Sequence, residues 1–207
     1  IRDLSLHVEP GQKIGCVGRT GAGKSTIIQL LYRMQEIDRS VDDTKESLIK
    51  MDQLNTQEVG LHLLRDNISI IPQTPFIFTG TIRLNVDPLG KFSDEEIWAA
   101  LEDVRLKQHV EKQPMKLDTQ IHGSTSVFSA GQKQLVCLAR AILKKSNVLI
   151  MDEATANMDY DTDFFVQKKI EQRFGHATQF TIAHRLQTIA NYDKVLVLDR
   201  GRKMEFD

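Results

Sequence analysis

A glycine-rich segment from Gly18 to Ser25 carries the first chemistry that this sequence suggests. It follows the pattern G-x-x-x-x-G-K-[ST], in which glycines let successive backbone N–H groups turn inward around phosphate oxygens. Lys24 would then reach the β- and γ-phosphates of a nucleotide, and Ser25 would hold Mg²⁺. A helix beginning here would add its positive N-terminal end. The residues expected to contact the nucleotide in this segment are Gly18, Arg19, Thr20, Gly21, Ala22, Gly23, Lys24, Ser25 and Thr26.

Two acidic residues, Asp152 and Glu153, end the apolar run Val148–Met151. Such a run is typical of a strand buried on both faces of a parallel sheet, and ligands of open α/β sheets collect at the carboxyl ends of the strands. Asp152 would coordinate Mg²⁺ through water, because this ion takes only one or two carboxylates. Glu153 would polarise the attacking water. Alone this pair is a weak signal, but beside a phosphate-binding pattern it indicates a nucleotide hydrolase.

A third segment, Phe128–Gln132, resembles the signature sequence of the ATP-binding cassette family. Its physical chemistry agrees, since Ser129 is a good N-cap and the helix behind it points its positive end outward. Gly131 lets backbone approach an anion. In that family this end meets the γ-phosphate of ATP held on a second domain. The resemblance therefore implies nucleotide contacts for Ser129, Gly131 and Gln132.

The resemblance extends along most of the chain. Gln73 is similar to the family's Q-loop glutamine, which touches Mg²⁺ and the attacking water, and Ala156–Asp159 is similar to the D-loop. His184 resembles the switch histidine that contacts the γ-phosphate. The catalytic residues that this implies are Glu153, His184, Gln73 and Lys24. The implied metal ligands are Ser25, Gln73 and Asp152.

The pattern of apolar residues indicates which elements position these side chains. Alternation predicts a strand at Leu4–Val8, and a capping box at Ser93 with Glu96 predicts a helix that runs to Gln113. The whole chain alternates between strands and helices, which predicts an α/β fold. The other expected elements are strands Lys13–Val17, Ser69–Ile71, Gln179–Ala183 and Lys194–Leu198, and helices beginning at Lys24, Ser129 and Phe164.

The resemblance makes this fold more specific. It implies a RecA-like P-loop NTPase with a mostly parallel sheet, an antiparallel β subdomain and an inserted helical subdomain. We expect residues 1–75 and 146–207 to form the nucleotide-binding core with the β subdomain, and 76–145 the helical subdomain. The polar stretch Glu36–Ser47 predicts an exposed loop. Because the chain opens on Ile1 inside a strand pattern, we also expect a piece of a longer polypeptide, with the adenine-stacking residue upstream.

The composition excludes several other classes. Lys plus Arg (27) nearly equals Asp plus Glu (28), so no basic field indicates nucleic acid as a partner. The two cysteines, Cys16 and Cys137, lie far apart without metal-ligand spacing and are expected to be core residues. No apolar run approaches the roughly 20 residues that span a bilayer. Membrane association would come from another part of the protein.

Within the family, Pro75–Arg83 and Asn85–Pro88 are similar to the C subfamily, which includes the multidrug-resistance-associated exporters. Glu153–Ala156 resembles the second, active cassette of such proteins. The resemblance implies ATP hydrolysis that powers transport, a head-to-tail dimer with a second nucleotide-binding domain, membrane domains of the same transporter, and a place on the cytoplasmic face of a membrane. A regulatory module of a channel or receptor with slow turnover is the alternative. DNA-repair and chromosome-organising ATPases would need a long heptad repeat between Lys24 and Ser129, and there is none. Soluble translation-type cassettes are a further alternative, which the stretch Pro75–Pro88 fits poorly.

Overall fold

The computed structural model describes residues 1–37, 48–122, 127–153, 158–183 and 185–207. His184 lies outside these residues, as do most of the predicted loop Glu36–Ser47 and the first two residues of the predicted D-loop, Ala156 and Asn157. Within the described residues no helix combines the length and apolarity needed to cross a membrane.

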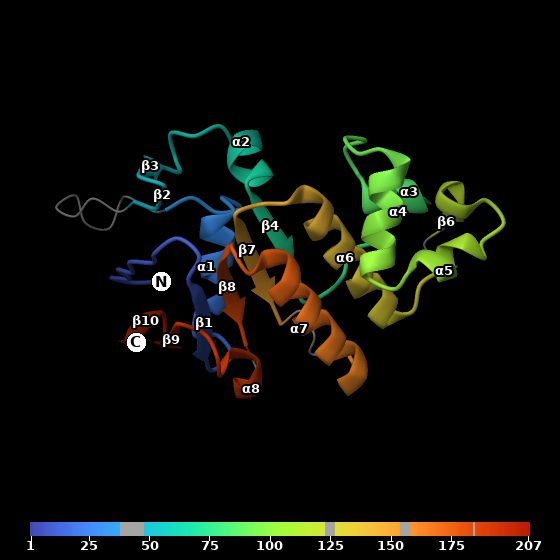
Figure 1. Ribbon diagram of the computed structural model, residues 1–207. Helices are drawn as coiled ribbons and strands as arrows, with labels where there is room; N and C mark the ends of the chain where they lie inside the picture. Colours follow the sequence, from blue (N-terminus) through green and yellow to red (C-terminus); the bar gives the residue numbers. More distant parts are fainter. Residues whose placement is uncertain (38–47, 123–126, 154–157, 184) are drawn as a thin grey trace. The chain divides into compact units, whose positions relative to one another are not determined.

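The chain forms two compact units. The first unit comprises Ile1–Ser69, Ser146–Ile150 and Ala177–Asp207, and the second comprises Ile70–Lys145 and Met151–His176. Both ends of the chain belong to the first unit (Figure 1), where the backbone N–H of Arg2 donates to the Gly201 carbonyl at 2.7 Å.

The described residues form a six-stranded sheet in the order β10-β9-β1-β8-β7-β4. Its centre is β1 (Lys13–Gly18), which pairs in parallel with β8 (Thr178–Ile182) and β9 (Lys194–Asp199). The last strand, β10 (Arg202–Phe206), is antiparallel to β9. The inner strands are buried on both faces, as the apolar runs predicted. The remaining strands, which continue from the first unit into the second, are β4 (Ile68–Ile71) and β7 (Val148–Asp152).

The rest of the first unit is joined by two arginines that donate to backbone carbonyls. Arg33 donates to the carbonyls of Thr56 and Val59 at 2.8 and 2.7 Å, and Arg65 donates to the Tyr32 carbonyl at 3.2 Å. These bonds give hydrogen-bond donors to carbonyls in turns, where no neighbouring strand supplies one. The elements here are helices α1 (Lys24–Leu31), α2 (Leu61–Asp66) and α8 (Leu186–Ile189), and the antiparallel pair β2 (Lys50–Met51) and β3 (Leu54–Asn55).

The predicted strand at Leu4–Val8 is wrong. The burial does alternate, with Leu4, Leu6 and Val8 half-buried and the residues between them exposed. However, the segment does not form a strand, and a side chain bonds to its backbone instead, since the Lys203 ammonium donates to the Ser5 carbonyl at 2.9 Å. Alternation reports which side chains face the protein, but a strand also requires a neighbouring backbone.

The second unit is mostly helical (Figure 1), and α6 (Ala130–Lys144) packs against α3, α4 and α7. The predicted capping box is confirmed, because the Ser93 hydroxyl accepts from the Glu96 N–H and the Glu96 carboxylate accepts from the Ser93 N–H. The other elements are helices α3 (Ile82–Val86), α4 (Asp94–Asp103), α5 (Lys107–Glu111) and α7 (Tyr160–Phe174), the 3-10 turn η1 (Lys116–Asp118), and the antiparallel pair β5 (Gly80–Thr81) and β6 (Gln120–Ile121).

The single helix predicted from Ser93 to Gln113 is also wrong, because α4 ends at Asp103. Arg105 adopts φ +59°, and the N–H groups of Leu106 and Arg105 donate back to the carbonyls of Leu101 and Glu102 at 2.8 and 3.0 Å. This is a Schellman motif, in which the left-handed residue is usually glycine. Here it is an arginine whose guanidinium lies 3.9 Å from the centre of the Phe165 ring.

Helix α7 begins at Tyr160, four residues before the predicted start, with Asp159 as its N-cap. The Asp159 carboxylate accepts from the Thr162 N–H at 3.0 Å, and this bond keeps the pKa of the carboxyl below its ordinary value. Further along, Lys169 and Arg173 both reach the carboxylate of Asp103 at the end of α4. One carboxylate thus ties α4 to α7.

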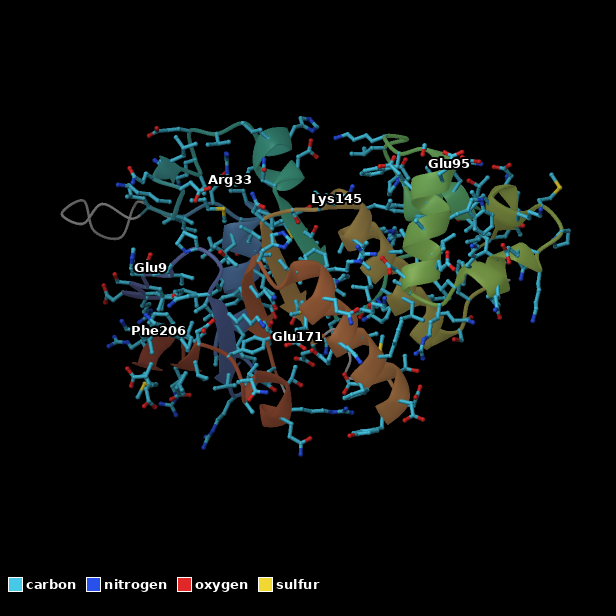
Figure 2. All side chains as sticks on the ribbon, viewed as in Figure 1. Glu9, Arg33, Glu95, Lys145, Glu171 and Phe206 are labelled. Atoms are coloured by element: carbon cyan, nitrogen blue, oxygen red, sulfur yellow. The ribbon has the colours of Figure 1, made fainter. Side chains whose placement is uncertain are left out.

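Lys145 ends α6 with φ +52° and lies exposed at the end of that helix (Figure 2). A residue with a side chain is strained in the left-handed region, and glycine is not. We therefore predict that Lys145→Gly raises the free energy of unfolding by about 0.5–1 kcal/mol. The matched control is Lys112→Gly, at the exposed end of α5 with φ −74°, where glycine should lower stability by about the same amount. Urea denaturation measures both. Equal effects of the two glycines would contradict this account.

Candidate nucleotide site

The phosphate-binding segment lies between β1 and α1, as its pattern predicted. Gly18 has φ +155°, and a Cβ there would lie 2.3 Å from the Leu198 carbonyl oxygen, so no side chain fits. Gly21 has open space around it but φ +79°, which makes glycine favourable for the backbone alone. The segment therefore follows a path that only a glycine-rich sequence takes without strain.

Lys24 is the most constrained charged residue of this segment. It is only 7% exposed, and its ammonium donates to the carbonyls of Gly18 and Arg19 at 2.8 and 3.3 Å. The first turn of α1 contains no acidic residue, so no side-chain anion offsets the positive end of the helix. In the same segment, by contrast, three side chains are exposed: Arg19, Thr20 and Ser25. A buried cation next to uncompensated N–H groups is suited to hold an anion.

The acid pair and Gln73 are brought together in the second unit. Asp152 is the last residue of β7, and Glu153 follows it with φ +48°. The side-chain amide of Gln73 donates to Glu153 Oε2 at 2.7 Å. Because both acids are half-buried and Gln73 is exposed, the amide fixes a carboxylate at the edge of the protein. This contact joins residues that are far apart in sequence and that we had predicted to act on the same water.

The segment Phe128–Gln132 opens α6 with a reciprocal cap. The Ser129 hydroxyl accepts from the Gln132 N–H at 3.2 Å, and Gln132 Oε1 accepts from the Ser129 N–H at 2.9 Å. Ser129 is exposed, the first turn contains no acidic residue, and the position of a Cβ on Gly131 is open space. Ser129 is therefore the N-cap that the sequence predicted. The accessible first turn of α6 can accept an anion.

Sequence reasoning missed Gln134, which holds the backbone next to Gln73. It is 7% exposed, and its side-chain Nε2 donates to the carbonyls of Pro72 and Gln73, each at 3.0 Å. A signal was present, because Gln134 lies four residues before the buried Leu138 on the same face of α6. A polar residue in an apolar stripe indicates a specific buried partner.

Arg140 on the same helix was missed as well. Its guanidinium donates to the Phe76 carbonyl at 2.7 Å and to the backbone carbonyl and side-chain oxygen of Asn85. Burial lowers the pKa of this guanidinium from its ordinary value. Asn85, which is fully buried, also exchanges hydrogen bonds with the backbone N–H and carbonyl of Phe78. These bonds fix the chain that follows Gln73.

The residues that we predict to bind Mg²⁺ are Ser25, Gln73 and Asp152, of which only Asp152 is a carboxylate. Among the described residues, no three His, Cys, Asp or Glu side chains are grouped so that they could hold a metal ion. Ser25 and Asp152 offer one hydroxyl and one carboxylate. This donor set fits Mg²⁺, which keeps several waters and completes its shell with substrate phosphates.

Comparisons with known proteins agree with the geometry. Residues 1–156 match the family model described as ABC transporter. The chain is 51% identical over 207 residues to human ATP-binding cassette sub-family C member 4 and 46% identical over 208 residues to ABC transporter C family member 14 of Dictyostelium discoideum. It spans 15% of the length of each. The fold is similar to that of a bacterial Atm1-family ABC exporter solved with ATP bound, with a TM-score of 0.86 and 34% identity over 98% of this chain and 34% of that one. This likeness confirms the predicted P-loop NTPase fold.

The contacts of Gln134 lead to a prediction about the backbone near Gln73. Gln134→Leu removes the donor from two carbonyls and should lower the free energy of unfolding by about 2 kcal/mol. Gln134→Glu should cost more, because a carboxylate would face the carbonyl oxygens. Amide hydrogen exchange of the segment after β4 should rise in both variants.

Denaturant unfolding and hydrogen exchange with mass spectrometry test this order. The matched control is Gln108→Leu, at an exposed position on α5, which should leave both measurements unchanged. If Gln134→Glu were as stable as the wild type, the described role of the donor would be wrong.

Proposed function

Because this chain belongs to the ABC transporter family, we propose that it is the nucleotide-binding domain of a transporter, in which it binds ATP and hydrolyses it with Mg²⁺ to move a substrate across a membrane. The observation that carries this proposal is Lys24, buried within a glycine-rich turn and bonded to neutral carbonyls. A phosphate oxygen is a charged acceptor, and its hydrogen bond to an ammonium is roughly twice as strong as a neutral one. ATP would therefore compete successfully for this ammonium.

Ser25, Asp152 and Gln73 are the residues that would hold Mg²⁺. When bound, this ion neutralises charge that develops on the phosphate oxygens. The hydroxyl and the carboxylate are the hard oxygen ligands that it prefers.

Glu153 is the residue that we assign to the attacking water. Its carboxylate would orient the water and accept a proton from it, and the Gln73 amide at 2.7 Å would keep the carboxylate in place. His184 would contact the γ-phosphate. In phosphoryl transfer the protein contributes mainly positioning and charge stabilisation, which these residues can supply.

The opening turn of α6 would serve a second domain. Ser129, Gly131 and Gln132 would contact the γ-phosphate of ATP held on the phosphate-binding segment of the partner, in a head-to-tail dimer. The accessible Ser129 and the open space at Gly131 support this assignment. Neither domain could then hydrolyse ATP by itself.

We propose that this chain is one domain of a larger membrane protein. Its relatives belong to sub-family C and are several times longer than this chain, which supports membrane domains in the same polypeptide and a position on the cytoplasmic face of the membrane. We assign the chain to the second cassette, which retains the catalytic glutamate at Glu153. We also propose that residues 1–75 and 146–207 form the nucleotide-binding core with the β subdomain, and residues 76–145 the helical subdomain.

Replacing the proposed base should separate binding from hydrolysis. We predict that Glu153→Gln retains ATP binding but loses about 100-fold or more of the hydrolysis rate, because removing one preorganised group costs about 2.7–4 kcal/mol. Phosphate release and equilibrium nucleotide binding measure the two effects. The control is Asp161→Asn, at an exposed acid in the first turn of α7, which should behave as the wild type. Wild-type turnover by Glu153→Gln would exclude this role.

The proposed dimer predicts how activity depends on concentration. Because each site takes residues from two domains, the ATPase rate per molecule of this chain should rise with protein concentration until dimers predominate. Phosphate release across a dilution series is the measurement, with Lys24→Ala as the inactive control. A rate per molecule that stays constant from dilute to concentrated solution would contradict the shared site.

A further inference from the structure

His109 on α5 contacts the signature segment from two sides. Its Nε2 lies 2.8 Å from the Val127 carbonyl oxygen, just before Phe128, and its Nδ1 lies 3.4 Å from Gln132 Nε2 in the first turn of α6. The ring is half-buried and packs against the Phe128 ring with centroids 5.6 Å apart. One imidazole therefore bridges the two ends of the segment Val127–Gln132.

The partners of His109 determine which ring nitrogen carries the proton. A carbonyl oxygen can only accept, so Nε2 must donate to Val127. Gln132 Oε1 already accepts from the Ser129 N–H at 2.9 Å, which turns the NH₂ group of Gln132 toward Nδ1. Nδ1 must therefore accept, and the neutral Nε2–H tautomer satisfies both contacts.

These bonds form a chain that ends on the residue proposed to bind ATP. His109 orients the amide of Gln132, that amide caps the N–H of Ser129, and the Ser129 hydroxyl in turn caps the N–H of Gln132. The second anchor, on the Val127 carbonyl, holds the chain immediately before Phe128. These contacts fix the direction of the Ser129 side chain. They also fix the direction in which the first N–H groups of α6 point.

We propose that His109 is a positioning residue of the signature segment, which keeps Ser129 and the first turn of α6 arranged for the ATP held by the second domain. The inference rests on the function proposed above, and it adds a residue that itself touches no phosphate. Preorganisation of this kind lowers the cost of ordering the segment when the nucleotide arrives.

The effect should appear in the apparent KM of hydrolysis. The signature segment would contact the γ-phosphate both before and during the reaction, so loosening it removes uniform binding and raises KM with little change in kcat. ATP binding to the assembled site should weaken by a similar factor, because the same contact is made before the reaction begins. For the loss of about one net hydrogen bond we expect KM to rise about fivefold.

Three variants test the contacts of the two ring nitrogens of His109 separately. His109→Phe keeps a ring against Phe128 but removes both nitrogens, and it should show the full fivefold increase in KM. His109→Gln can place an amide nitrogen near the position of Nε2, and His109→Asn can place an oxygen near that of Nδ1. Each should recover part of the wild-type KM. The control is His176→Phe, the same change at an exposed histidine of the second unit.

The measurements are steady-state ATPase kinetics, nucleotide binding and thermal unfolding of the natural full-length polypeptide that contains these 207 residues. A raised KM in His109→Phe, with a matching loss of ATP affinity, little change in kcat and partial rescue by Gln or Asn, supports the proposal. A wild-type KM in His109→Phe overturns it, as does a loss of kcat that follows the loss of thermal stability without rescue. Lys24→Ala separates the two claims: if that variant still hydrolyses ATP normally, the proposed function itself fails.

Discussion

The packing of the second unit depends on side-chain donors of α6. They bond to backbone carbonyls of a segment that belongs to no helix or strand. Gln134 and Arg140 donate to the carbonyls of Pro72, Gln73 and Phe76, and the buried Asn85 completes the set. An unpaired buried carbonyl costs about 1–3 kcal/mol, so this irregular chain could not lie against α6 without them. The same helix presents Ser129 at its N-terminal end. One element thus supports both the backbone of Gln73 and the signature segment.

The parts of the site that the sequence predicted are those whose geometry is local. Glycines at Gly18 and Gly21 permit backbone angles that other residues avoid, and Ser129 caps the helix that begins immediately after it. The strand Val148–Met151 was found for a similar reason, because a continuous apolar run reports burial on both faces. In each of these segments, neighbours in sequence determine the conformation.

The parts that the sequence did not predict depend on partners far along the chain. Leu4–Val8 alternates as a strand should, but lacks the ladder that only another segment could provide. Helix α4 ends at Asp103 and is followed by the left-handed Arg105, where no glycine marked the stop and where the Phe165 ring lies beneath the guanidinium. The role of His109 follows from one acceptor, the Val127 carbonyl, and one donor, the Gln132 amide, both more than fifteen residues away. Such contacts are set by the tertiary fold, which periodicity does not encode.

The shared carboxylate of Asp103 has a consequence for how this domain tolerates change. Lys169 and Arg173 lie one turn apart on α7, where two cations alone would repel each other, and the single acid between them removes that repulsion. Loss of either cation leaves the other to keep α4 and α7 joined. In the part of the chain that the structure describes, no second acid shares this role with Asp103. Substitutions should therefore be tolerated better at Lys169 or Arg173 than at Asp103.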